Sequence, residues 1–166
     1  MRNAQGLPPM RVEEARLPMH DAARGRSPDC QACHGSHGYD TRFAAMDACS
    51  ACHDDAHTRA YRSSRHAALF ADERAGRAVE GSGVSCATCH FPRETGADGR
   101  VHVVHDQNQN LRPKEKMLRE VCMICHSLAF SIDALADDAL VRRNFTGEPA
   151  RHVTSIDLAL RRARAQ

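Results

Sequence analysis

The stretch Cys86-Ala87-Thr88-Cys89-His90 contains two cysteines three positions apart, and a histidine follows the second one directly. The same Cys-x-x-Cys-His pattern occurs at 30–34, 49–53 and 122–126, and the four copies use all eight cysteines of the chain. The pattern is the attachment signature of c-type haem, in which two thiols bond to one porphyrin and the histidine coordinates its iron. The sequence therefore predicts four covalently bound haems c. Their expected binding residues are Cys30, Cys33, His34, Cys49, Cys52, His53, Cys86, Cys89, His90, Cys122, Cys125 and His126.

Other uses of paired cysteines explain this repetition less well. Two structural zinc sites with four cysteines each would use the same pairs, but they would not require a histidine after every second cysteine. A disulfide framework also has an even number of cysteines, yet nothing in it demands this repeated spacing. A thioredoxin-like redox pair would occur once, within an alternating strand and helix pattern. Covalent haem attachment is therefore the leading interpretation.

The composition agrees with an interior that is filled by cofactors. The 166 residues are enough for one compact domain, which we expect to span 1–166. Only 4% of them are aromatic, and there is no tryptophan, so large core-forming side chains are scarce. We expect a mainly α fold with extensive loops and little or no β structure, wrapped around the haems. No apolar run reaches the length of a membrane span.

The net charge gives little information about partners. The chain carries a formal charge of +2, and four haems with ionised propionates would change it to about −2. We therefore expect no nucleic-acid partner. The expected partners are redox proteins that donate and accept electrons.

Local patterns divide the chain into an arm, helices and loops. Residues 1–28 are rich in proline, arginine and glycine and predict an extended arm. Helical periodicity is expected at about 57–71 and over 114–145, where it continues through the fourth motif. Residues 91–100 are expected to form a loop. A last helix is expected over 154–165, because its first residues have the form of a capping box.

Seven histidines lie outside the motifs, and four are needed if every iron is six-coordinate. A distal ligand approaches the face opposite the proximal one, so His37 and His57 cannot serve the haem directly before them and would ligate a neighbouring haem. In an extended segment His102 and His105 point to opposite faces, and Asp106 favours His105 because it can orient the ring. The expected distal ligands are His20, His57, His66 and His105, with His37, His102 and His152 in reserve.

Over roughly residues 17–145 the chain resembles the multihaem cytochromes c, and more narrowly the cytochrome c554 and hydroxylamine oxidoreductase group. The resemblance is carried by the stretch from Gly83 to Pro92, the Ser-x-x-His stretch at 63–66 and the stretch ending in His105-Asp106. It implies closely stacked haems, export before haem attachment, and electron transport in the periplasm or outside the cell. It also implies distal roles for His66 and His105.

Three functions remain open at this point. The leading hypothesis is an electron carrier that moves single electrons between closely spaced, mostly bis-histidine haems. A haem enzyme of the nitrogen-oxide or hydroxylamine type would need one iron with an open site, and His37 or His102 would then supply protons. A third hypothesis is a subunit of an extracellular cytochrome filament or larger complex, in which the arm reaches a neighbour. Residues 1–6 lack the apolar region of a secretory signal. We therefore expect either that a signal was removed and lies outside this numbering, or that the chain never had one.

Overall fold

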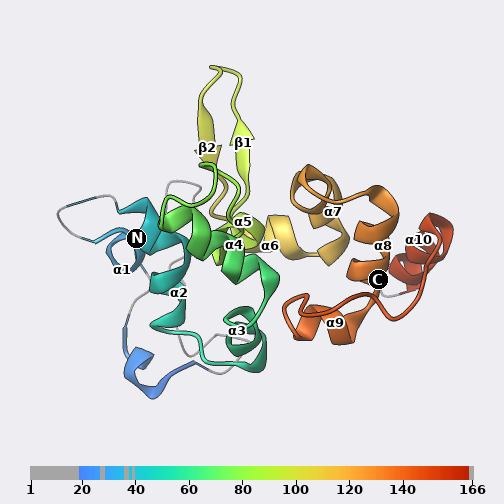
Figure 1. The fold of residues 1–166 in the computed structure, drawn as a ribbon, viewed down its shortest axis with the longest axis horizontal. Helices are drawn as coiled ribbons and strands as arrows, with labels where there is room; N and C mark the ends of the chain where they lie inside the picture. The colour runs from blue at the N-terminus through green and yellow to red at the C-terminus, as the bar shows by residue number, and fades with distance from the viewer. Residues whose placement is uncertain (1–18, 27–28, 36–37, 39, 165–166) are drawn as a thin grey trace.

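The computed structural model describes residues 19–26, 29–35, 38 and 40–164. Most of the expected arm at 1–28 lies outside these residues, and so does His37. Short helices joined by loops make up most of the described chain, with one small hairpin (Figure 1). The mainly α fold class with extensive loops is therefore confirmed.

The first and third Cys-x-x-Cys-His motifs are each a short helix with its own N-cap. At the start of the first, the Asp29 carboxylate accepts hydrogen bonds from two backbone amides. At the start of the third, Ser85 and Thr88 form a reciprocal capping box. The α-helices of the part of the chain that carries the first three motifs are α1 (Cys30–His34), α2 (Ala48–Ser50), α3 (Ala56–Tyr61), α4 (Arg65–Arg74), α5 (Cys86–His90) and α6 (Gln107–Leu111).

The single helix expected at about 57–71 is wrong, because the chain forms α3 and α4 there instead. Ser64 separates them, and its hydroxyl accepts a hydrogen bond from the backbone amide of Ala67 at 3.1 Å. A serine in this position caps a new helix more favourably than it continues an old one. The break sets the direction of α4, which carries His66.

Residues 91–100 are not only a loop. Strand β1 (Arg93–Thr95) pairs antiparallel with β2 (Val101–Val103), and Arg93 lies opposite Val103. This hairpin projects from the body of the molecule (Figure 1). It is the β structure of the described residues, which agrees with the expectation of little or none.

The continuous helix expected over 114–145 is also wrong. Ser127 and Asp137 interrupt the helix although the apolar periodicity continues, because each side chain caps a new helix by accepting from backbone amides. The fourth motif itself begins with a 3₁₀ turn at Cys122–Ile124. The segment is divided into a 3₁₀ turn at Lys114–Lys116, α7 (Met117–Glu120), α8 (Leu128–Ala136) and α9 (Asp138–Arg142).

The last helix, α10 (Ser155–Arg164), begins one residue later than expected. The Thr154 hydroxyl caps the helix, because it accepts from the Asp157 amide at 3.2 Å, and it donates to Asp157 Oδ2 at 2.8 Å; this side-chain hydrogen bond stands in place of the reciprocal half of the expected capping box. Among the described residues no helix is long and apolar enough to cross a membrane.

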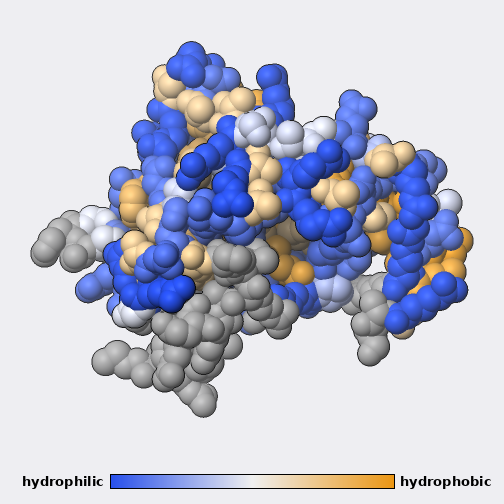
Figure 2. All heavy atoms as spheres, turned by 90° about the horizontal axis from the view of Figure 1, so that it is seen from below, coloured by the Kyte–Doolittle hydropathy of each residue, from blue (hydrophilic) through white to orange (hydrophobic). Residues whose placement is uncertain are grey.

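Large buried side chains gather at the C-terminal end of the molecule. Ile132, Val153 and Leu158 form a cluster, and Leu135 and Leu140 are almost fully buried. The half with the first three motifs has few buried apolar residues besides Tyr61 and two alanines. The face seen in Figure 2 is largely hydrophilic, with apolar atoms in separate small areas. Such a weak side-chain core is what a cofactor-filled interior predicts.

Candidate haem-binding sites

Consecutive Cys-x-x-Cys-His motifs are spatial neighbours. Burial raises the pKa of Cys33, and the nearby thiol of Cys49 in the second motif raises it further. Cys49 in turn hydrogen-bonds to Cys86 of the third motif, which raises the pKa of Cys49. Burial, with Cys122 of the fourth motif nearby, raises the pKa of Cys89 to about 12. The four motifs therefore form a series in the order of the sequence.

Three of the four motif histidines face a second histidine from elsewhere in the chain. In each case the two rings are tilted against each other, with 59–64° between their planes. The pairs are His34 with His105 at 6.3 Å between ring centroids, His57 with His90 at 6.3 Å, and His66 with His126 at 6.2 Å.

This spacing fits one iron between the two rings of each pair. A nitrogen ligand lies about 2 Å from a transition metal, and the centroid of an imidazole lies about 1.2 Å behind that nitrogen. Two imidazoles on opposite sides of one metal ion therefore have centroids about 6.4 Å apart. The donor set also fits, because neutral imidazoles on both faces are a usual ligation of c-type haem.

Hydrogen bonds and burial prepare the pair His57 and His90 for metal binding. His57 Nδ1 lies 2.8 Å from the carbonyl oxygen of Val141 and donates to it, so Nε2 carries the lone pair. Burial lowers the pKa of His90 to about 4, and the nearby imidazoles of His57 and His53 act in the same direction. The lowered pKa keeps the His90 ring in the neutral form that a metal ion requires.

Aromatic rings surround the pair His66 and His126. Phe130 stacks on His126 with centroids 4.8 Å apart, and Phe145 lies edge-on to His66 at 6.5 Å. Burial lowers the pKa of His66, and His126 lowers it further. Helix α4 begins after its N-cap Ser64 and carries His66 in its first turn. In this position the His66 ring lies across from His126 of the fourth motif.

The two histidines that follow the hairpin turn have different surroundings. His105 Nδ1 donates to the carbonyl oxygen of Val103 at 2.9 Å, which leaves Nε2 available opposite His34. His102 instead lies with its Nε2 3.4 Å from Asp98 Oδ1 within the hairpin. The structure thus brings His105 to a motif and leaves His102 on the hairpin.

The second motif is arranged differently. Met19 pairs with His53 in an isolated antiparallel bridge, and the His20 amide donates to the Cys52 carbonyl at 2.8 Å. Directly paired residues share one face, so His20 lies on the other face. There its Nδ1 is 3.9 Å from Asp54 Oδ2. Within the described residues His53 therefore has no second imidazole at the spacing of the other pairs.

The two other reserve histidines, His152 and His37, add no further imidazole pair among the described residues. His152 Nδ1 lies 3.1 Å from Asp133 Oδ2, at the C-terminal end of the molecule and outside the three pairs. His37 is outside the residues that the structure describes.

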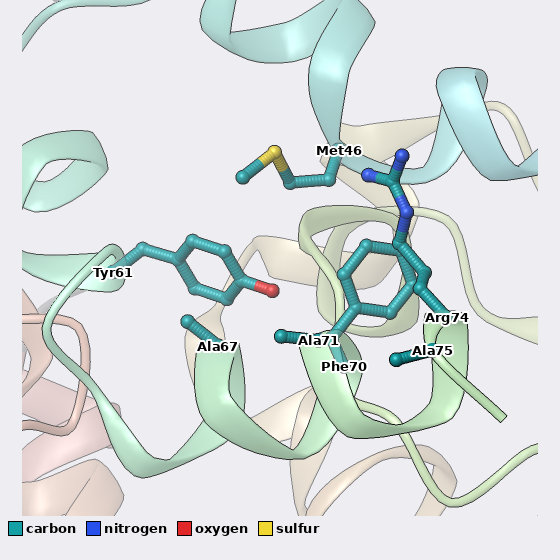
Figure 3. A pocket seen from close by; sticks show the side chains of 7 residues that line it. All are labelled: Met46, Tyr61, Ala67, Phe70, Ala71, Arg74 and Ala75. Carbon is teal, nitrogen blue, oxygen red and sulfur yellow. The ribbon is translucent and has the colours of Figure 1, made fainter. Parts of the chain in front are cut away.

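A cavity of about 360 Å³ lies next to the second and third motifs. Figure 3 shows the side chains of Met46, Tyr61, Phe70 and Arg74 around it. The buried Tyr61 hydroxyl donates to the carbonyl of Val84 at 2.9 Å, close before the third motif, and burial raises its pKa. The cavity has a mainly apolar wall with one guanidinium at its rim. No sequence motif marks these residues, because Met46, Tyr61 and one face of α4 come together only in the folded chain.

The chemistry assigned to this chain thus depends on its own geometry. Four motifs lie in series, and three of their histidines have a partner imidazole at a spacing that fits one metal ion. Comparison of the chain with models of protein families, with curated proteins and with solved structures gives no match.

Proposed function

We propose that this chain is a tetrahaem c-type cytochrome that transfers single electrons through mostly bis-histidine centres. The observation that carries the proposal is the spacing of the three imidazole pairs, 6.2–6.3 Å between centroids, on three motifs with the haem-attachment pattern. Each haem, when bound, supplies an iron that alternates between the ferrous and ferric states. A zinc or disulfide role for the cysteines would give no reason for these pairs.

The chain holds each centre with residues from different segments. The cysteine pairs anchor the cofactors, and the motif histidines serve as proximal ligands. His105, His57 and His66 serve as distal ligands of the first, third and fourth centres. The carbonyls of Val103 and Val141 accept the Nδ1 protons of His105 and His57, which strengthens Nε2 as a donor and favours ferric iron.

The serial contacts between motifs support a single route for electrons. The first motif lies near the second, the second is hydrogen-bonded to the third, and the third lies near the fourth. Electrons would therefore enter and leave near the two ends of this series. We expect redox proteins as partners and a periplasmic or extracellular location, since c-type haem is attached after export in the group that the chain resembles.

The second motif is where the alternative function, a haem enzyme, has support. His20 lies beside Asp54 and away from the face of His53, so this centre is the candidate for an open iron site. An open iron would bind small ligands such as nitrite, hydroxylamine, nitric oxide or peroxide.

Expression with the cytochrome c maturation machinery of a bacterial host tests the proposal. The purified protein is assayed for covalent haem as the pyridine haemochrome, and the reduced form is titrated with carbon monoxide. Four haems per chain and no binding of carbon monoxide support an electron carrier. One equivalent of carbon monoxide supports the enzyme at the second centre. A chain that folds stably without covalently bound haem contradicts both functions.

A further inference from the structure

The last turn of α9 and the loop that follows it contact the distal imidazoles of two different centres. The carbonyl oxygen of Val141 accepts the Nδ1 proton of His57 at 2.8 Å. The side-chain amide of Asn144 lies 3.0 Å from Nε2 of the same ring and donates to the backbone carbonyl of His57 at 3.3 Å. The ring of Phe145 lies 6.5 Å from that of His66. Three neighbouring residues thus reach both α3 and α4.

The backbone of this loop has an uncommon conformation. Asn144 and Phe145 have φ angles of 49° and 55°, in the left-handed region that a bulky residue rarely adopts. Such a conformation persists only where the surroundings impose it. Here the Phe145 amide donates to the carbonyl of the buried Leu140 at 2.9 Å, and the Thr146 hydroxyl donates to the carbonyl of Ala60 at 3.4 Å.

The two contacts of His57 select one tautomer. Val141 accepts from Nδ1, so Nδ1 carries the proton. Asn144 donates to Nε2, so Nε2 carries the lone pair. That lone pair is the one that an iron would take. Ligation of an iron and this hydrogen bond exclude each other at Nε2, so on ligation the amide would leave Nε2 and keep the His57 backbone carbonyl as its acceptor.

We propose that Asn144 and Phe145 are positioning residues that set the orientation of the distal imidazoles of the third and fourth centres, and thereby tune the potentials of these two centres. This inference rests on the proposed haem function. The left-handed backbone turns both side chains of adjacent residues toward rings on separate helices, which a regular helix end would not do. One loop thus links the ligand geometry of two neighbouring centres.

Loss of the Asn144 amide has a definite expected direction. Without it α3 loses the hydrogen bond from this loop to the His57 backbone carbonyl, so His57 shifts relative to Val141 and the hydrogen bond from Nδ1 weakens. A weaker hydrogen bond makes the imidazole a poorer donor to ferric iron, so the midpoint potential of the third centre rises. Loss of the Phe145 ring frees His66 in the same way and changes the angle between the imidazole planes of the fourth centre.

The test compares Asn144→Gly and Phe145→Gly with a matched control, Thr146→Val. Glycine adopts the left-handed region freely, so these two variants remove a side chain without adding backbone strain. The control lies in the same loop and loses the hydrogen bond from its hydroxyl to the backbone carbonyl of Ala60. Potentials are measured by redox titration, and electron paramagnetic resonance (EPR) reports the angle between the ligand planes. Signals are assigned with His57→Ala and His66→Ala.

We expect Asn144→Gly to raise the potential of the third centre and to change its EPR signal, with the first and second centres unchanged. Phe145→Gly changes the signal of the fourth centre, and Thr146→Val changes neither. Fully haem-loaded variants with wild-type potentials and signals overturn the inference. If Asn144→Gly is obtained without its full set of haems, an unchanged EPR signal of the fourth centre in Phe145→Gly overturns the inference. A wild-type chain without haem would instead refute the proposed function.

Discussion

Replacement of His105 by alanine should open the first centre to an external ligand. His105 is exposed and lies across from His34, with 6.3 Å between the ring centroids. Under the proposed function its removal would leave His34 as the one axial ligand, and the reduced iron would be five-coordinate. Because one of four centres changes, the variant should bind one equivalent of carbon monoxide per chain more than the wild type, on about a further quarter of its haem. The lost hydrogen bond to Val103 should lower the stability by about 1 kcal/mol.

His102 provides the matched control for this experiment. It lies three residues earlier, and its ring is beside Asp98 on the hairpin. Carbon monoxide is added to the reduced wild type, His105→Ala and His102→Ala, and the haem absorbance is followed to saturation. His102→Ala should bind the same amount as the wild type. Equal binding by both variants, or no added binding by His105→Ala, would refute the assignment of the first centre.

Three further variants test the packing that supports the sites. Ser64→Ala removes the N-cap of the helix that carries His66 and should lower the free energy of unfolding in denaturant by about 1 kcal/mol. Leu135→Ala, at a fully buried side chain, should lower it by about 2–5 kcal/mol, whereas Val79→Ala, at a side chain that is 80% exposed, should change it by less than about 0.5 kcal/mol. Two backbone amides hold the pKa of Glu73 below its ordinary value of 4.5. Its stabilising contribution is therefore complete above that pH and is lost as the pH falls through the lower folded pKa, so melting curves of the wild type and Glu73→Gln should converge in acid.

The sequence was most informative where covalent chemistry requires a fixed spacing. The Cys-x-x-Cys-His pattern identifies its residues without a knowledge of the fold, and the low aromatic content indicates a weak core. The helical fold class follows from the same composition. For the distal ligands, His57, His66 and His105 each lie across from a motif histidine, whereas His20 lies beside Asp54.

Helix boundaries were harder to predict, for a physical reason. Apolar periodicity continues through Ser64, Ser127 and Asp137, but each of these side chains bonds to backbone amides and begins a new helix. The competition between a cap and a continuing helix depends on the tertiary contacts on either side. The roles of Asn144 and Phe145 were hidden for the same reason, because their contacts join segments more than 75 positions apart.

Haem stoichiometry tests the central claim most directly. The chain is produced with haem maturation, and the mass of the intact denatured protein is measured together with the pyridine haemochrome absorbance. Four covalently attached haems per chain, on all eight cysteines, is the predicted result. A protein that is folded and stable with free thiols, disulfides or bound zinc in place of haem would contradict the account.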